Sequence, residues 1–273
     1  AGMFALYFFG SESLASLSLK LFETSEHYTL MAIPFFILGG TIMSTGGVAK
    51  RLIRFAVACV GHIKGGLAIA SVLACTFFAA VSGSSPATVV AVGTIMIAGM
   101  VNAGYPKKFA AGILCNAGTL GILIPPSIVM VVYCAVTEQS VGRIFLAGIV
   151  PGLLLSLMMM VAIYIYARIN REGSEKVEVH EYTWKERFEI LPKIIPFVLL
   201  VVGVLYVLYG GIATPNEASA VGALISIILV AVVYKMYKVK DIWAILTESM
   251  SESVMLMMII AASFLFSFVL SNL

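Results

Sequence analysis

The chain has 273 residues, of which 61% are hydrophobic and 11% are charged, with a formal net charge of +3. A soluble chain carries roughly a quarter charged residues, so this composition excludes an ordinary soluble protein and predicts an integral membrane protein. We expect no nucleic-acid partner, because the Lys and Arg residues lie in loops that flank apolar segments. The weak alternating pattern of an outer-membrane barrel is missing, which leaves an all-α polytopic fold.

The apolar runs predict membrane spans joined by short polar loops. In chain order, complete spans are expected at 28–45, 144–167, 194–209, 215–234 and 241–270. The segment 50–61 is too short to cross and carries basic residues on one face, which is typical of a helix lying in the membrane interface. Pro215 is expected at the first position of its helix, with Glu217 in the first turn. The one long hydrophilic stretch, 168–193, is expected to contain an amphipathic helix at 184–191.

An uncharged stretch of 35 residues, 65–99, is the most informative part of the chain. It holds two apolar arms of about 15 residues each, shorter than the ~20 that a spanning helix needs, separated by the polar sequence from Val81 to Pro86. Ser, Gly and Pro in succession weaken a helix, so we predict a re-entrant hairpin. Irregular backbone at mid-membrane persists only where it is buried in protein or lines a wet cavity, which makes the tip a candidate binding site. The alternative is one long helix kinked at Pro86.

A second interruption lies in 109–136, where two glycines three residues apart precede the pair Pro125 and Pro126. Proline removes a backbone donor and biases the preceding residue away from helical angles, and glycine is a poor helix former. We therefore predict two half-helices joined by an unwound segment at mid-membrane. The alternative is a helix that is merely kinked at Pro125.

The basic residues test this layout through the positive-inside rule. If the span at 28–45 runs from outside to inside, the inner segments carry 15 of the 17 Lys and Arg residues. These inner segments are 50–64, 102–108, 168–193 and 235–240, and the outer loops keep only Lys20 and Arg143. The asymmetry requires the stretch 65–99 to return to the side from which it entered, so it favours the hairpin over a full span.

The two interrupted segments offer neutral oxygen ligands and no carboxylate. They are the side chains of Ser82, Ser84, Ser85, Thr88, Asn116 and Thr119 and the carbonyls around Gly83, Gly118 and Gly121. In ion-coupled carriers, unwound carbonyls bind a cation while half-helix N-termini face an anionic substrate. A divalent ion would normally require carboxylates and proton coupling a titratable group at depth, so sodium is the expected ion. The alternative is that these small residues serve helix packing.

No catalytic or cofactor-binding residue is predicted. His27, His62 and His180 fall in loops, where none is placed to activate a buried serine. The four cysteines lie in apolar runs without CxxC spacing, so they indicate no metal site or disulfide framework. An intramembrane hydrolase or lipid-group transferase is the alternative from another functional class, and the buried acid–base pair that it needs is not found in the sequence.

Four segments together carry a resemblance to one family. They are 30–55, 61–96, 105–127 and 210–224, and the most specific motifs within them are SGSSPAT, GTLGILIPPS and ATPNEA. Over nearly all its length the chain resembles the large membrane subunit of tripartite ATP-independent periplasmic (TRAP) transporters of the C4-dicarboxylate type. Members of that family are longer, and this chain begins at Ala1 without a methionine, so we expect a fragment without the second hairpin and its ion site.

The resemblance implies an elevator-type, sodium-driven transporter with inverted-repeat architecture in the bacterial inner membrane. It also implies a small TRAP membrane subunit, a periplasmic substrate-binding protein and a small organic acid, such as a C4-dicarboxylate, as partners. By resemblance, the first sodium site comprises Ser82, Gly83, Ser84, Asn116, Gly118, Thr119 and Gly121. The candidate substrate contacts are Ser85, Pro125, Pro126 and Ser127. The alternative transporter is an ion-coupled elevator carrier of another family.

The predicted elements and the resemblance together divide the chain into four parts. Residues 1–64 are expected to form scaffold spans and an interfacial arm helix, and 65–136 the hairpin and broken helix of a transport domain. Residues 137–193 are expected to form a span and a cytoplasmic linker, and 194–273 the start of a second inverted repeat.

Overall fold

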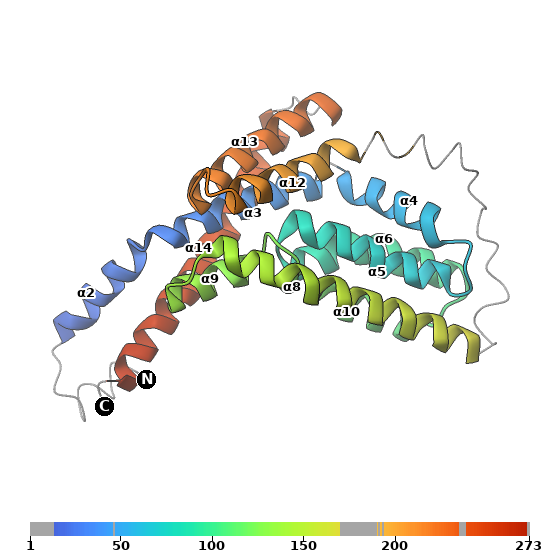
Figure 1. Ribbon diagram of the computed structural model, residues 1–273, viewed down its shortest axis with the longest axis horizontal. Helices are drawn as coiled ribbons and strands as arrows, with labels where there is room; N and C mark the ends of the chain where they lie inside the picture. Colours follow the sequence, from blue (N-terminus) through green and yellow to red (C-terminus); the bar gives the residue numbers. More distant parts are fainter. Residues whose placement is uncertain are drawn as a thin grey trace.

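The computed structural model describes residues 14–45, 47–169, 190, 192, 194–234 and 239–271, and no strand is found among them. The elements, most of them labelled in Figure 1, are α2 (Leu14–Ser25), η1 (Tyr28–Met31), α3 (Ala32–Thr45), α4 (Val48–Val60), α5 (Gly66–Ser82), α6 (Ser85–Asn102), α7 (Lys107–Gly118), α8 (Leu120–Leu123), α9 (Ile128–Thr137), α10 (Val141–Ile169), α12 (Ile195–Tyr209), α13 (Pro215–Tyr234) and α14 (Val239–Ser271). Four described helices are long and apolar enough to cross a membrane, or up to six if each of two bent pairs is one span. The predicted all-α, multi-pass fold is confirmed.

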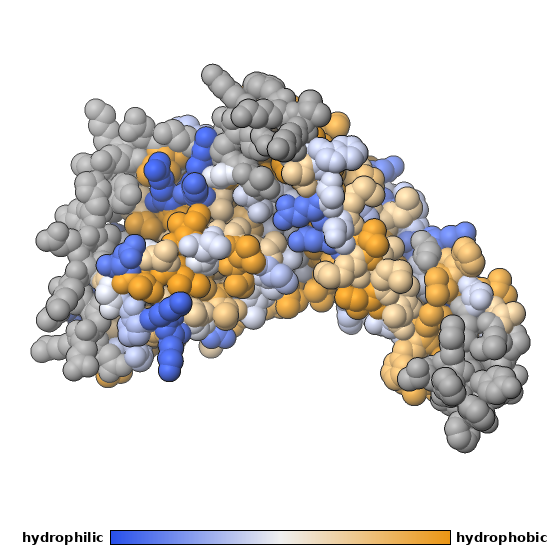
Figure 2. Space-filling view, turned by 180° about the vertical axis from the view of Figure 1, so that it is seen from behind, coloured by the Kyte–Doolittle hydropathy of each residue, from blue (hydrophilic) through white to orange (hydrophobic). Residues whose placement is uncertain are grey.

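The outer surface of the described helices is rich in large apolar side chains. Val150 on α10 is 71% exposed and Tyr206 on α12 is 69% exposed, and Figure 2 shows broad orange areas of hydrophobic surface. Soluble monomers rarely expose contiguous apolar patches larger than a few hundred Å². An exterior of this kind is suited to contact with lipid.

Most predicted element boundaries agree with the structure within a few residues. Pro215 begins α13 as expected, and the Glu217 carboxylate accepts bonds from the backbone N–H and the hydroxyl of Thr214, both at 2.8 Å. One difference is α2, which we expected to be a polar outer loop. There the ion pair between Lys20 and Glu23 at 2.8 Å lies one turn apart and supports a helix. The helix expected at 184–191 falls almost entirely outside the described residues.

The stretch 65–99 forms a helical hairpin from α5 and α6. The Ser71 hydroxyl near the start of α5 lies 3.5 Å from the Met100 sulfur near the end of α6, while Ser82 and Thr88 meet at 3.0 Å beside the turn. The two helices therefore run antiparallel, and the alternative of one kinked helix is wrong. The arms are slightly longer than predicted, because α6 continues to Asn102, and α6 alone reaches a spanning length.

The second interruption is also confirmed, at a narrower place than predicted. The helix axis bends by 42° between Lys107–Leu123 and Ile128–Thr137, and both Ile124 and Ser127 are extended, with ψ of 120° and 130°. Gly118 and Gly121 remain inside α7 and α8. Glycine costs a helix only about 1 kcal/mol, whereas proline costs about 3 kcal/mol, so the Pro-Pro pair decides where the helix ends.

The buried hydrophobic residues form two main clusters. The first contains the fully buried Phe78 and Leu114 and joins α4, α5, α6 and α7 to the end of α10. The second contains Phe145 and joins α9 and the start of α10 to η1, α3, α12, α13 and α14. Helix α3 contributes to both, with Met43 in the first cluster and Ile33 in the second. The two clusters thus place α7 and α9 in different cores, and the four-part division stays a prediction.

Helix α10 packs across both the hairpin and the break. The hydroxyls of Thr76 on α5 and Ser156 on α10 share a buried hydrogen bond of 2.6 Å. A Cβ atom added at Gly148 would lie 2.7 Å from the Leu123 carbonyl oxygen, and one added at Gly152 would lie 2.9 Å from the Ile124 side chain. Small residues of this kind let membrane helices approach closely, so α10 holds the break against the hairpin.

Turns and ends of other helices lie beside each of the two ends of α10. At its C-terminal end, a Cβ added at Gly65 would lie 2.8 Å from the Ala167 Cβ, so the α4–α5 turn lies beside the end of α10. At its N-terminal end, a Cβ added at Gly142 would lie 3.3 Å from the Leu208 carbonyl oxygen. The α4–α5 turn, which the basic-residue count assigns to the inner side, thus lies beside the end of α10 that the count also assigns to the inner side, as a hairpin requires.

We expect Gly148→Ala to lower the thermal stability of the protein, because the added methyl group meets the Leu123 carbonyl and overpacking costs about 1–3 kcal/mol. Gly112→Ala is the matched control, since nothing lies within 4 Å of its added Cβ and alanine is the better helix former. Melting of the detergent-solubilised full-length protein, followed by size-exclusion fluorescence, measures both. Equal melting temperatures for the two variants would contradict the packing of α10 on the break.

Cysteine accessibility tests the hairpin topology. In full-length protein lacking its native cysteines, cysteines at Lys107 and Arg168 are expected to react with an impermeant maleimide from the cytoplasmic side. A cysteine at Gln139, at the opposite end of α10, is expected to react from the periplasmic side. Labelling of positions 107 and 139 from the same side would show that the stretch 65–99 crosses the membrane completely.

Candidate functional site

The hairpin tip is a two-residue turn whose shape follows from its sequence. Gly83 has a φ of +62° and its N–H donates to the Ala79 carbonyl at 2.9 Å, so it ends α5 in a left-handed conformation that glycine adopts without strain. Ser84 is extended and caps α6, and Pro86 lies in the first turn, where a missing N–H costs nothing. The sequence Ser-Gly-Ser-Ser-Pro therefore ends one helix and starts the next within two residues.

Three hydroxyls of the tip are bonded within the tip itself. The Thr88 hydroxyl donates to the Ser84 carbonyl at 2.8 Å and shares a 3.0 Å bond with the Ser82 hydroxyl. The Ser84 hydroxyl accepts a long bond of 3.5 Å from the Ala87 N–H. These bonds account for much of the polar sequence as capping of α6, so an ion would compete with them for the same oxygens.

The tip makes backbone contact with the break between α8 and α9. The Gly83 carbonyl accepts a hydrogen bond of 3.2 Å from the Ile128 N–H, the first backbone donor of α9. A Cβ at Gly83 would collide with the Pro126 carbonyl, and one at Gly121 would lie 2.8 Å from the Ser84 carbonyl carbon. The two interrupted segments predicted from the sequence are therefore in direct contact.

Two further glycines bring neighbouring helices close to the tip. A Cβ at Gly118 would collide with the Val89 side chain on α6. Gly40 of α3, which our sequence analysis did not single out, lies so close that an added Cβ would be 3.0 Å from the Ser82 carbonyl oxygen. The signal that was available is the Gly39-Gly40 pair inside an otherwise bulky apolar span.

Two buried hydroxyl oxygens at this junction have no hydrogen-bond partner. They belong to Ser85, in the first turn of α6, and to Ser127, the residue immediately before α9. Ser127 is 0% exposed, and leaving a buried hydroxyl unpaired costs roughly 1–3 kcal/mol. Both residues are among the predicted substrate contacts. Pro125 and Pro126, the other two, are buried beside them and are joined by a cis peptide bond.

Four helix ends meet at this junction. The N-termini of α6 and α9 carry partial positive charge, and the C-termini of α5 and α8 carry partial negative charge. Because the tip bonds to Ile128 and lies against Gly121, all four ends lie around the same short stretch of backbone. An anion is stabilised by the first pair of ends and a cation by the second pair.

The side chains of Asn116 and Thr119 do not join the tip. Both are exposed, the Asn116 amide donates to the Gly112 carbonyl at 3.1 Å, and the Thr119 hydroxyl donates to the Asn116 carbonyl at 2.6 Å. They line a hollow of about 490 Å³ between α7 and α10. Both side chains therefore face this hollow, and their place in an ion site stays a prediction.

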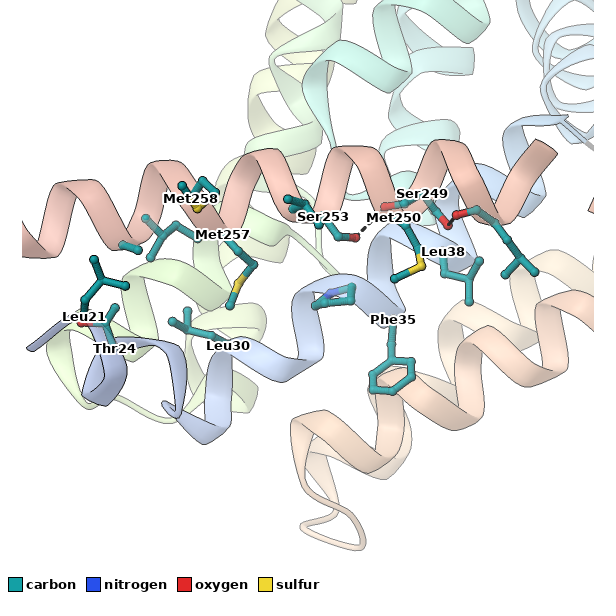
Figure 3. A pocket seen from close by; sticks show the side chains of 15 residues that line it. Leu21, Thr24, Leu30, Phe35, Leu38, Ser249, Met250, Ser253, Met257 and Met258 are labelled. Carbon is teal, nitrogen blue, oxygen red and sulfur yellow. Dashed lines mark hydrogen bonds between the residues drawn. The ribbon is translucent and has the colours of Figure 1, made fainter. Parts of the chain in front are cut away.

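A second hollow, about 430 Å³ in volume, lies between α14 and the segment from α2 to α3 (Figure 3). Its lining is apolar apart from a few hydroxyls. The Ser253 hydroxyl donates to the Ser249 carbonyl at 2.6 Å, and the Ser249 hydroxyl donates to the Leu246 carbonyl at 3.0 Å. Since these serines already bond within their own helix, the hollow offers little for recognising a polar ligand, and the tip–break junction is the stronger candidate.

Known proteins resemble this chain in sequence over its whole length. A sequence profile of the family described as tripartite ATP-independent periplasmic transporter, DctM component, matches residues 1–273. The chain is 56% identical over 273 residues to the C4-dicarboxylate TRAP transporter large permease protein DctM of Pseudomonas aeruginosa, covering 100% of this chain and 63% of that protein. It is 53% identical over 281 residues to the protein of the same name in Vibrio cholerae, covering 95% and 61%.

A more distant relative is the ectoine TRAP transporter large permease protein TeaC of Halomonas elongata, which is 36% identical over 271 residues, covering 98% of this chain and 62% of that protein. The chain spans about three fifths of the length of these relatives. The match of the family profile to every residue, with the identity to the two DctM proteins, shows that the chain belongs to the DctM-component family of tripartite ATP-independent periplasmic transporters.

Proposed function

We propose that the protein is the permease subunit of a sodium-coupled secondary transporter that imports small organic acids. Membership of a transporter family supports this proposal and leaves an intramembrane enzyme without support. The observation that carries it is the tip–break junction, where two helix N-termini meet beside the unpartnered hydroxyls of Ser85 and Ser127.

An anionic substrate fits the electrostatics of the junction. The N-termini of α6 and α9 together favour a carboxylate, as half-helix N-termini do in other carriers. Ser85 and Ser127 supply hydroxyl donors that have no other partner, and Pro125 and Pro126 shape the wall beside them. We propose these four residues as substrate contacts.

Sodium fits the oxygen chemistry of the same place. The proposed ligands are drawn from hydroxyls and carbonyls, a donor set that suits a hard monovalent cation better than a divalent one. The proposed set is Ser82, Gly83, Ser84, Asn116, Gly118, Thr119 and Gly121. Within it, Ser82, Gly83 and Ser84 belong to the tip, and Gly121 lies against it. Sodium is here a cargo that the transporter moves with the substrate.

The choice of organic acid follows the relatives' names. Two relatives named for C4-dicarboxylates are 56% and 53% identical to this chain, whereas a relative named for ectoine is 36% identical. We therefore propose a C4-dicarboxylate as the first substrate to test. Family membership supports the remaining parts of the proposal. We propose a small TRAP membrane subunit and a periplasmic substrate-binding protein as partners, location in the bacterial inner membrane, and an elevator-type movement of inverted repeats.

Hydroxyl deletions test the site. We expect Ser127→Ala or Ser85→Ala to weaken the apparent affinity for sodium or for succinate about five- to a hundredfold, because a lost ligand in a buried site costs about 1–3 kcal/mol and ~1.4 kcal/mol is tenfold. Initial uptake of labelled succinate is measured in proteoliposomes that contain the full-length permease and its partners. Sodium and succinate concentrations are varied separately.

Three further variants locate the ion. Ser82→Ala removes a tip hydroxyl, Thr119→Val removes the hydroxyl in the α7–α10 hollow, and Thr94→Val removes an exposed hydroxyl on α6 as the control. A shifted sodium midpoint with Thr119→Val alone would place the ion site in the hollow instead of at the tip. Unchanged sodium midpoints and succinate KM values for the first four variants, or an equal shift with Thr94→Val, would remove the tip–break junction from the transport site.

Dependence on the partners tests the remainder of the proposal. We expect succinate uptake to fall to background when either the periplasmic binding protein or the small membrane subunit is left out, because the permease receives substrate from the one and is anchored by the other. Full sodium-driven uptake by the permease alone would contradict the tripartite assignment while leaving the junction itself open to the hydroxyl test.

A further inference from the structure

Four exposed cations gather at the end of the molecule where the α4–α5 turn, the α6–α7 turn and the end of α10 meet. They are Lys64, Lys107, Lys108 and Arg168, which we call the basic rim. Two contacts place these turns beside the last turn of α10. Gly65 lies against Ala167, and the ring of Phe109, next to Lys108, stacks on Tyr166 at 5.1 Å. Figure 2 shows hydrophilic residues beside hydrophobic surface at this end of the molecule.

A stack of three aromatic rings lies directly below the basic rim. Tyr105 and Phe109 have ring centroids 6.0 Å apart and an interplanar angle of 6°, and Phe109 continues the stack onto Tyr166. Amphipathic aromatic rings are enriched at the level of lipid headgroups. Tyr166, whose ring is half exposed, is therefore suited to the level of the headgroups, and the stack on the buried Tyr105 fixes its position.

Tyr164 orients the guanidinium group of Arg168 and leaves some of its N–H donors unused. Its Nε and Nη2 groups donate to the Tyr164 hydroxyl at 3.1 and 2.8 Å, and its Cζ lies 5.4 Å from the centroid of the Tyr164 ring. A guanidinium group carries five N–H donors, so other N–H groups remain for an oxyanion. A guanidinium group oriented in this way is suited to bidentate binding of a phosphate.

The exposed face of α10 leads to the basic rim as an apolar stripe. Leu157, Val161 and Ile165 are 54%, 47% and 51% exposed and follow one another at intervals of four residues. The opposite end of α10 is different, since Arg143 is the one cation of the described residues there and the acidic Glu138 lies five residues before it. Exposed apolar residues such as Leu146 and Val150 also reach that end, so the two ends of α10 differ in the number of cations and not in the apolar stripe.

We propose that the basic rim binds the headgroup of an anionic phospholipid, with its phosphate on Arg168, the lysines of the rim attracting the same negative charge, and its acyl chains along Leu157, Val161 and Ile165. The charge complementarity commits the site to an anionic lipid, because no carboxylate in the described part of the chain forms an ion pair with the basic rim. This binding does not depend on the proposed transport function.

Lipid binding to the purified full-length protein tests the proposal. Native mass spectrometry compares dioleoylphosphatidylglycerol with dioleoylphosphatidylcholine for the wild type, Arg168→Gln and the double variant Lys107→Gln/Lys108→Gln. A juxtamembrane cation contributes about 1 kcal/mol toward an anionic lipid surface, which is about fivefold. We expect the phosphatidylglycerol affinity to fall about fivefold for Arg168→Gln and about five- to thirtyfold for the double variant, with phosphatidylcholine binding unchanged.

Two controls make the test specific. Lys107→Arg/Lys108→Arg keeps the charges and is expected to keep the lipid preference, and Arg143→Gln removes a cation from the opposite end of α10 and is expected to leave it unchanged. Inorganic phosphate is expected not to displace the lipid, because it has no acyl chains to bury; displacement would mean a soluble-anion site and would overturn the proposal.

Other outcomes also count against the proposal. Equal binding of the two lipids by the wild type, or an equal loss with Arg143→Gln, would show that the basic rim has no special affinity for anionic lipid. Unchanged phosphatidylglycerol binding by the double variant would show that the cations are engaged elsewhere. The stretch 170–193, which carries six glutamates, would then be the first candidate partner, and the lipid proposal would be wrong.

Discussion

The hydrogen bond from the Ile128 N–H to the Gly83 carbonyl joins the two interrupted segments of this protein, and the surrounding structure depends on it. In the interior of a membrane an unpaired backbone group costs several kcal/mol, so a broken helix is viable only if another segment meets its free donors. The hairpin tip does this for α9. To reach that position, Gly83 must take a left-handed conformation and must lack a Cβ, since the Pro126 carbonyl occupies that space.

The same constraint explains where the other small residues lie. Gly40 brings α3 to the tip, Gly121 brings α8 to it, and Gly148 brings α10 to the far side of the break. Each of these glycines lies where the backbone of another segment comes so close that a Cβ atom would have almost no room. The glycines of this region are thus packing positions around a backbone junction, and the only one that needs its conformational freedom at the tip is Gly83.

Hydrophobicity, helix breakers and charge count were enough to predict the spans, the hairpin and the broken helix, because each depends on local or additive properties of the sequence. The residues at which the broken helix ends were harder to predict from the sequence. Gly118 and Gly121 suggested unwinding, yet tertiary packing against α6 and the tip keeps both helical. The direction of side chains was not predictable at all. Asn116 and Thr119 lie in the same motif as Gly121, but helical rotation turns them toward α10, while the unpaired hydroxyl of Ser127 becomes visible only when its neighbours are placed.

The convergence of helix ends also offers a physical basis for the sodium coupling proposed above. The N-termini of α6 and α9 favour an anion, and the C-termini of α5 and α8 favour a cation, around one short stretch of backbone. Opposite unit charges about 5 Å apart attract by roughly 3 kcal/mol at an effective dielectric constant of about 20. A coupling of that size changes the affinity for one cargo more than a hundredfold when the other is bound, and linkage makes the effect reciprocal. A junction built from helix ends therefore needs no buried carboxylate or arginine to make the binding of a carboxylate depend on sodium, in keeping with the uncharged sequence from which the hairpin is made.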